Sequence, residues 1–296
     1  MNLPLVPLFA ALWSVCAAQS DNDSTAPIVL APPPWTLKGT VYSATFVPLS
    51  KKLPTKAYSP LERGSAVQTE GEFLGGIGMV QIIRYTESPV GPYDELLLLP
   101  GFFKYDGPTG ERTNVRITRI YVSQKYTCWN GRTNWNIPKH LARFDWTEKN
   151  GATTVKIYPH DTTGDPLESK PAEKPWFKAT FTLDLLGGLP FTTDLYDILG
   201  VNTTLAQPPL PHAESKYHEL AGTNHWAATV PGQATNKASI GIFDLDQGEG
   251  DVVEGQTTNV VGDEHYPNFW PGLLRFHPGM KLEDATITFS EPEIWG

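Results

Sequence analysis

Residues 114–124 read NVRITRIYVSQ and form the clearest period-2 segment of the chain. Because successive side chains of a β-strand point to opposite faces, this pattern predicts one strand across these residues. One face would carry Val115, Ile117, Arg119 and Tyr121, and the other Ile120 and Val122. The stretch therefore predicts β structure in the middle of the chain.

Shorter segments of the same kind lie on both sides of this stretch. Rich in β-branched and aromatic residues, they predict strands at 38–47, 78–85, 95–100, 153–158, 179–186, 240–244, 252–261 and 286–290. Short helices are expected at 138–144 and 194–199. The 27 prolines and 26 glycines favour many turns. These features predict a mainly-β fold, a barrel or curved sheets with a few short helices, in one domain over residues 35–296.

An apolar run, LPLVPLFAALWSVCAA, occupies residues 3–18. It is shorter than the ~20 residues of a membrane-spanning helix and ends in small residues, as a secretory signal peptide does. We therefore expect a signal peptide at residues 1–18, a proline-rich linker at residues 19–34 and no stable membrane span after cleavage. An uncleaved N-terminal anchor is the competing interpretation, because no Lys or Arg precedes the run.

The expected location is outside the cell or in the lumen of the secretory pathway. There, Asn22 and Asn202, in the triplets NDS and NTT, would become acceptors for N-linked glycans. Cleavage of the signal peptide would remove Cys16 and leave Cys128 as the single cysteine. No intrachain disulfide is therefore expected.

Charge and motif content narrow the class of partner. The formal net charge is −9 and Lys and Arg form no cluster, which argues against nucleic acid. No metal or cofactor is expected, because the seven histidines form no ligand-spaced pair and the acidic stretch 244–251 lacks the EF-hand pattern. The expected partner is a small-molecule substrate, and a homo-oligomer remains compatible with the sequence.

The segment NGRTNWNIPKHLARFDW, residues 130–146, contains the candidate reactive amine, Lys139. Asn136 is a good helix N-cap, and Pro138 and Lys139 would then lie in the first turn of a short helix. The partial positive charge at that helix end disfavours an ammonium group and lowers its pKa. Trp135 and Phe144 would add an apolar wall around the lysine.

A neutral lysine requires a large effect of its surroundings. A free lysine has a pKa near 10.4, and lowering it to ~7 means disfavouring the ammonium by about 4.6 kcal/mol. A helix end supplies about 0.3–1 kcal/mol, at most ~2 when partly buried, whereas burial shifts a lysine by ~3–5 units. Lys139 is therefore either a deeply buried reactive amine or an ordinary solvated lysine.

Two segments resemble the acetoacetate decarboxylase family: SPVGPYDELLLLPG at residues 88–101 and GRTNWNIPKHLARF at residues 131–144. The resemblance implies a mainly-β, barrel-like fold. It places Lys139 where the family has the lysine that forms a Schiff base with a β-keto acid, and acetoacetate decarboxylase is the standard example of such an activated lysine. It also makes Glu95 an active-site acid that positions substrate and transfers protons. The alternative for Glu95 is an exposed residue before a buried strand.

Four more site residues follow from the same two segments. Arg132 is expected either to bind a substrate carboxylate or to form a structural ion pair. Trp135 and Tyr93 are expected to contact the substrate. His140 is a catalytic candidate that departs from the family pattern, because decarboxylating members carry a second lysine there, whereas an imidazole is mostly neutral at pH 7.

Three functions are compatible with these residues. The first is a carbon–carbon lyase that forms a lysine Schiff base with a β-keto acid or a related carbonyl metabolite. The second is a small-molecule cyclase of natural-product biosynthesis, which uses the same fold without Schiff-base chemistry and acts by holding its reactants in a productive geometry. The third, outside the enzymes, is a secreted protein that binds lipophilic ligands.

Overall fold

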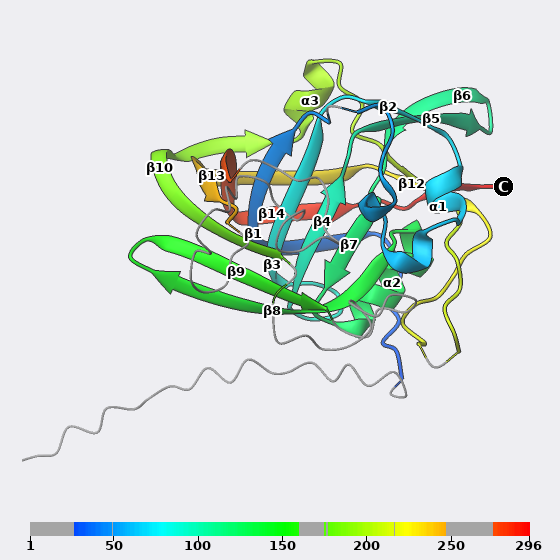
Figure 1. Cartoon of the computed structure of the whole chain (residues 1–296), viewed down its shortest axis with the longest axis horizontal. Coiled ribbons are helices and arrows are strands. Elements are labelled where there is room, and N and C mark those ends of the chain that lie inside the picture. The colour runs from blue at the N-terminus through cyan, green and yellow to red at the C-terminus, as the bar shows by residue number, and fades with distance from the viewer. Residues whose placement is uncertain (1–26, 49, 160–174, 176, 216, 247–274) are drawn as a thin grey trace, which may run out of the picture.

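The computed structural model of the protein describes residues 27–48, 50–159, 175, 177–215, 217–246 and 275–296. Within them, nine strands close into a barrel and six further strands form a second sheet beside it (Figure 1). This architecture confirms the expected mainly-β fold with short helices. The predicted strand at 252–261 and residues 1–26 lie outside the described residues.

The barrel wall is mainly antiparallel. In order around the wall its strands are β1 (Trp35–Phe46), β14 (Phe276–Phe289), β13 (Pro231–Asp244), β10 (Phe177–Thr192), β9 (Ala152–Pro159), β8 (Lys139–Lys149), β7 (Arg119–Val122), β4 (Tyr93–Leu99) and β3 (Gly78–Glu87). Strand β3 pairs with β1 and closes the wall. Strands β7 and β8 run parallel, because helix α2 (Lys125–Trp135) provides the crossover that a parallel pair needs.

The second sheet and the remaining helices are short. The sheet contains, in order, β15 (Glu293–Trp295), β12 (Trp226–Thr229), β11 (Leu205–Gln207), β6 (Gly110–Val115), β5 (Phe102–Gly107) and β2 (Glu72–Gly75). The other helices are α1 (Ala66–Thr69), α3 (Asp194–Ile198) and the 3₁₀ turns η1 (Thr55–Ala57) and η2 (Pro60–Glu62). Helix α3 confirms the helix predicted at 194–199.

The stretch 114–124 is not one strand. Strand β6 ends at Val115, and the chain passes from the second sheet into the barrel before β7 begins at Arg119. Arg116, fully buried at this crossing, donates hydrogen bonds to the main-chain oxygens of Val67 and Glu70. The single-strand prediction was wrong here because a period of two shows β structure without showing which sheet each half joins.

The barrel wall is apolar on both faces. On β3, Val80 and Ile82 belong to one buried cluster, whereas Ile83 and Tyr85 belong to a second cluster that also contains residues of α2 and the second sheet. Burial on both faces explains the nearly continuous apolar run of β4, YDELLLL. It also leaves Glu95 of β4 as a charged group within a buried strand.

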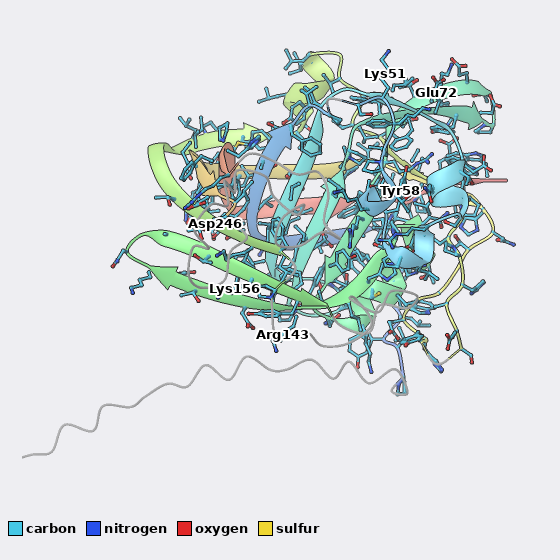
Figure 2. All side chains as sticks on the ribbon, in the orientation of Figure 1. Lys51, Tyr58, Glu72, Arg143, Lys156 and Asp246 are labelled. Carbon is cyan, nitrogen blue, oxygen red and sulfur yellow. The ribbon has the colours of Figure 1, made fainter. Side chains whose placement is uncertain are left out.

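Many of the other charged side chains lie at the periphery, although Arg116, Arg119, Lys125 and Glu219 are buried. Figure 2 labels Lys51, Glu72 and Arg143, all of which are exposed and spread around the rim of the molecule. The buried charged residues described next are exceptions to this distribution, and burying a charge is costly unless it is paired.

Candidate functional site

Residues 138–144, which include Lys139, do not form the predicted helix. Helix α2 ends at Trp135, and Asn136 follows it in the left-handed conformation with φ 54°, which asparagine tolerates better than most residues. Lys139 then begins strand β8. The prediction was wrong because asparagine suits both ends of a helix, and Pro138 lies where a proline commonly follows a helix C-terminus.

Lys139 and Glu95 form a buried ion pair. The lysine Nζ lies 2.8 Å from Oε2 of Glu95, and the two side chains are 6% and 3% exposed. Nζ also donates a hydrogen bond to Oγ1 of Thr127 at 3.0 Å and lies 5.2 Å from the ring centroid of Tyr93. The other carboxylate oxygen of Glu95 accepts a hydrogen bond from the Tyr85 hydroxyl at 3.1 Å. Strands β3, β4 and β8 and helix α2 thus hold both charged groups.

The pKa of Lys139 is raised, opposite to the direction expected from the sequence. Burial is the largest single contribution and lowers this pKa, but the charge and hydrogen bond of Glu95, together with smaller contributions from Tyr93 and Cys128, outweigh it. Lys139 is therefore buried, as expected for a reactive amine, but the raised pKa favours its ammonium form. Burial also raises the pKa of Tyr93 to about 12 and, together with the Glu95 charge, that of Tyr85 well above its ordinary value.

A glycine in α2 makes room for the lysine side chain. A Cβ atom at Gly131 would lie 2.6 Å from Cδ and 2.7 Å from Cε of Lys139. Such distances are shorter than a van der Waals contact, so any larger residue at this position would push the lysine stem away. The Gly-Arg pair that belongs to the family-like segment thus has a steric reason for its glycine.

A cavity of about 280 Å³ lies beside the ion pair. Residues of the barrel strands β1, β3, β4, β10, β13 and β14 line it, together with residues of β5, β6, β11 and α3. Glu95 and Tyr85 belong to the lining, whereas Lys139 lies behind Glu95 and does not. The lining is largely aliphatic and aromatic, and Glu95 is the single charged side chain among the described residues that form it.

His140 and Arg132 belong to a separate buried network. His140 Nε2 lies 2.7 Å from Oε2 of Glu62, and Nη1 of Arg132 donates to Oε1 of the same carboxylate at 3.0 Å; all three side chains are fully buried. Because adjacent residues of a strand point to opposite faces, His140 faces away from the side that carries Lys139. Arg132 also donates to the main-chain oxygens of Lys139 and Ala221.

This network holds the backbone next to the ion pair and does not contact the cavity. Arg132 takes the structural role rather than that of a substrate clamp, and His140 does not join Lys139 and Glu95. Burial alone raises the pKa of Glu62, but the neighbouring His140 and Arg132 together lower it. The sequence contained no signal for Glu62, which lies 70 positions before Arg132 in a 3₁₀ turn.

The other predicted site residues are placed as follows. Tyr93 lies beside Lys139 but is not part of the cavity lining. Trp135 packs edge-on against Trp35 with ring centroids 5.2 Å apart, and it is part of the core rather than of the cavity. Asn202 is exposed and lines the cavity, whereas Asn22 lies outside the described residues. The cavity residues Tyr85, Gln81 and Gln233 were not predicted, although the first two lie on one face of a predicted strand.

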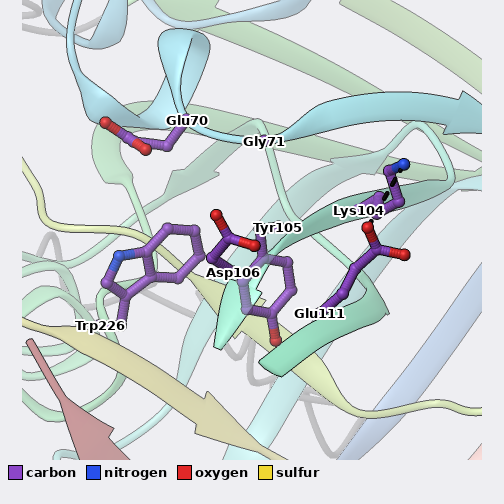
Figure 3. A pocket seen from close by; sticks show the side chains of 7 residues that line it. All are labelled: Glu70, Gly71, Lys104, Tyr105, Asp106, Glu111 and Trp226. Carbon is purple, nitrogen blue, oxygen red and sulfur yellow. Dashed lines mark ion pairs between the residues drawn. The ribbon is translucent and has the colours of Figure 1, made fainter. Parts of the chain in front are cut away.

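A second pocket, of about 340 Å³, lies on the other sheet (Figure 3). It is lined by charged residues, with an ion pair between Lys104 and Glu111 at 3.5 Å, and by Tyr105 and Trp226, whose rings stack on each other 4.7 Å apart. It contains no residue of the family-like segments 88–101 and 131–144. The apolar cavity beside Glu95 is therefore the stronger candidate site.

The described residues contain neither a candidate metal site nor a candidate membrane-spanning helix. No group of three or more His, Cys, Asp or Glu side chains in that part of the chain is arranged to hold a metal ion. The described helices also include none with the length and apolar character needed to cross a membrane.

Part of the chain is similar to two plant proteins. No family model matches the chain. The chain resembles Protein NEOXANTHIN-DEFICIENT 1 of Oryza sativa subsp. japonica, with 32% identity over 117 residues, 39% of this chain and 35% of that protein. The Arabidopsis thaliana protein of the same name is 32% identical over 115 residues, 38% of this chain and 37% of that protein. The matched stretch thus spans little more than a third of each plant protein.

Two solved acetoacetate decarboxylases share the architecture. The enzyme of Legionella pneumophila superposes with a TM-score of 0.54 at 13% identity, over 93% of this chain and 94% of that one. A second acetoacetate decarboxylase superposes with a TM-score of 0.54 at 11% identity, over 89% and 90% of the two chains. At these identities the likeness concerns the fold, and the chain has an acetoacetate decarboxylase-like fold.

Proposed function

We propose that the protein is an enzyme acting on a largely apolar small molecule, with Glu95 as the group that exchanges protons with it. One observation carries the proposal: Glu95 is the single charged side chain among the described lining residues of an apolar cavity. A cavity of about 280 Å³ is near the lower end of small-molecule sites, which measure roughly 300–1,000 Å³. Polar groups that converge in such a cavity, here Glu95 and Tyr85, are typical of an active site.

The geometry suits a cyclisation or isomerisation that needs no net proton. Glu95 accepts a proton from the bound substrate and returns it to another atom of the same molecule. The Lys139 ammonium, 2.8 Å away, compensates the carboxylate charge before the proton is accepted and after it is returned, and Tyr85 donates a hydrogen bond from the cavity side. In a dry cavity these preorganised charges act more strongly than in water.

The names of the plant relatives are consistent with an apolar substrate. Each is called NEOXANTHIN-DEFICIENT 1, and neoxanthin is an oxygenated, largely hydrocarbon molecule. We place the activity in the secretory pathway on the basis of the apolar run at residues 3–18 and the sequons at Asn22 and Asn202. Finding Asn202 unmodified in protein recovered from the producing cells, with residues 1–18 still attached, would contradict this location.

The proposal is tested by the substitution Glu95→Gln. We expect the wild-type protein to consume a neutral compound from an apolar extract of the producing cells, followed by liquid chromatography and mass spectrometry. Loss of an acid–base group lowers the rate by about 10²–10⁴-fold, so Glu95→Gln should be nearly inactive. Asp94→Asn, at the adjacent position of β4, is the matched control with retained activity. Equal turnover by Glu95→Gln and the wild type would refute the proposal.

A lyase with a Schiff base on Lys139 is the second candidate. It is favoured by the acetoacetate decarboxylase-like fold and by the position of Glu95, which is close enough to take the proton that the Lys139 ammonium must lose. The amine would add to the ketone of a β-keto acid and expel water, and the iminium nitrogen would receive the electron pair released with carbon dioxide. Against it stand the raised pKa of Lys139 and the lack of a cation among the described lining residues to hold a carboxylate.

Borohydride trapping separates the two candidates. With acetoacetate and borohydride, a Schiff-base enzyme gains the mass of the reduced adduct on Lys139, and the variant Lys139→Met does not. The proton-transfer enzyme keeps its mass under the same conditions while it still consumes its apolar substrate.

A further inference from the structure

Two glutamines meet in the apolar cavity. Gln81 of β3 and Gln233 of β13 both line it. Nε2 of Gln233 donates to Oε1 of Gln81 at 3.1 Å, and Nε2 of Gln81 donates in return at 3.4 Å. The same Nε2 of Gln81 lies 3.4 Å from Oγ of Ser43, which also lines the cavity.

Hydrogen bonds to Thr193, which also lines the cavity, fix the main chain of Gln233. The main-chain N–H of Gln233 donates to Oγ1 of Thr193 at 3.0 Å, and the N–H of Thr193 donates to the main-chain oxygen of Gln233 at 2.9 Å. Gln81 is only 7% exposed and lies within strand β3. The two amide groups therefore have a defined position relative to Glu95.

The strand register gives the separation of the amide pair from the ion pair. Ile83 of β3 faces Glu95 on β4, and Gln81 faces Leu97. A strand rises by about 3.3–3.4 Å per residue, so these two levels are about 7 Å apart along the strands. The cavity thus has one polar point at Glu95 and a second one about 7 Å further along.

The amide pair differs chemically from Glu95. Two amides and a hydroxyl have no formal charge, and they both donate and accept hydrogen bonds. The two contacts that Nε2 of Gln81 makes, at 3.4 Å, are longer than a usual N–H···O bond, whereas the bond from Gln233 to Gln81 at 3.1 Å is of ordinary length. A ligand oxygen can therefore take the place of the long contacts at little cost, and an apolar ligand group gains no hydrogen bond there.

We infer that Gln81 and Gln233, with Ser43, form a subsite for a neutral oxygen function of the substrate. The inference rests on the proposed function and specifies its substrate class: an apolar ring or chain with two neutral oxygen functions. A hydroxyl group lies at Glu95, and a carbonyl or hydroxyl group lies at the amide pair. A hydrocarbon with one oxygen function fits only half of the site.

The alternative is that the hydrogen bonds between the two amides only connect β3 to β13. A structural hydrogen bond of this kind contributes to stability alone, whereas a subsite also changes the preference between two ligands. Binding is measured by displacement of N-phenyl-1-naphthylamine, a neutral apolar fluorophore. The competing ligands are 2-decalol, with one hydroxyl group, and 6-hydroxy-2-decalone, which adds a carbonyl group at the far end of the same bicycle.

The variant Gln81→Met/Gln233→Met removes the amides at nearly constant volume. We expect the ratio of the two dissociation constants, 2-decalol over 6-hydroxy-2-decalone, to fall about tenfold relative to the wild type, as for one lost buried hydrogen bond. Comparing ratios between proteins cancels the different solubilities of the ligands. Leu98→Met, an apolar exchange on the face of β4 opposite the cavity, should keep the wild-type ratio.

An unchanged ratio in a folded double variant would overturn the subsite. If the double variant does not fold, as judged from its thermal unfolding, the single variant Gln233→Met is measured in the same way, and an unchanged ratio there has the same meaning. Failure of the wild-type protein to bind the fluorophore would instead overturn the proposed function itself, because no apolar ligand would then enter the cavity.

Discussion

The charge state of Lys139 depends on two opposing contributions at the scale of single residues. Removal from water disfavours the ammonium, whereas the Glu95 carboxylate at 2.8 Å favours it. Because an isolated buried charge is costly, the neighbouring carboxylate determines the protonation of Lys139. The pKa of Lys139 therefore depends on Glu95, and removing this carboxylate should reverse the direction of the pKa shift.

The substitution Glu95→Gln should lower the pKa of Lys139 below its ordinary value. Without the carboxylate, burial is the largest remaining contribution, and it acts in that direction. The Lys139 ammonium of the wild type should persist above the ordinary lysine range, and that of the variant should titrate below it. The measurement is the pH dependence of the Lys139 Cε chemical shift by NMR. If the Lys139 Cε of Glu95→Gln still titrated above the ordinary lysine range, Glu95 would not be the cause of the raised pKa. Asp94→Asn is the control and should leave the titration of Lys139 unchanged.

The substitution Gly131→Ala should displace the lysine. The added Cβ would lie 2.6 Å from Lys139 Cδ, and overpacking a buried position costs typically about 1–3 kcal/mol. Helix propensity alone would favour alanine by about 1 kcal/mol, so a net loss of stability in urea unfolding identifies the clash. Gly187→Ala, whose Cβ would meet only Ser239 Cβ at 3.9 Å, is the tolerated control. A gain of stability in Gly131→Ala would contradict the steric role of this glycine.

At the scale of elements, one carboxylate joins a turn, a helix and a strand. Glu62 of η2 binds Arg132 of α2 and His140 of β8. Arg132 in turn donates to the main-chain oxygen of Lys139, where β8 begins. The network thus fixes the start of β8 relative to α2, and through it the position of the Lys139 side chain.

The substitution Glu62→Gln should destabilise the protein by about 3–5 kcal/mol, because it leaves a buried guanidinium without its partner. The pKa of Glu62 is lowered in the folded protein. A lowered carboxyl pKa stabilises the fold above the unfolded value and loses this contribution as the pH falls through the folded value. The stability difference between the wild type and Glu62→Gln should therefore shrink below about pH 4.5.

Urea unfolding at pH 7 and at a series of acidic pH values measures this difference. Glu72→Gln, at an exposed position of β2, is the matched control and should change stability by no more than about 0.5 kcal/mol. A pH-independent difference for Glu62→Gln would show that its charge has no part in the network.

At the scale of the whole molecule, the cavity exists because two sheets meet without filling the space between them. The barrel strands β3 and β4 present one face to it, and β5, β6 and β11 present the other. Neither sheet alone encloses a ligand. The candidate site is thus a product of the assembly of the two sheets, with the ion pair at one of its edges.

Filling this space should abolish ligand binding without unfolding the protein. Leu97 of β4 lines the cavity, and Leu97→Trp places an indole in the volume that a ligand would use. We expect affinity for N-phenyl-1-naphthylamine to fall at least about tenfold, with a thermal unfolding transition still present. Leu98→Met, on the opposite face of β4, is the matched control and should bind as the wild type does. Unchanged binding by Leu97→Trp would place the ligand elsewhere.

Local patterns in the sequence were sufficient for most strands of the barrel. They located β1, β3, β4 and β9 within a few residues and only the C-terminal part of β13, because the arrangement of apolar side chains is a property of the strand itself. Local patterns failed where two interpretations share the same residues. Asn136 suits both ends of a helix, and the stretch 114–124 gave no sign of the crossing between sheets. Helix α2 was not predicted, since its segment has no marked apolar period.

The sequence by itself determined the mainly-β class and the faces of the strands and, through two family-like segments, indicated Lys139 and Glu95 as candidate site residues. Only the tertiary structure decided that this lysine is an ammonium, that His140 faces away from it, and that Gln81 meets Gln233 across 152 positions of chain. The physical reason is that electrostatic and hydrogen-bond energies depend on distances in space. Those distances are set by how the strands close around the barrel and against the second sheet, which no local pattern contains.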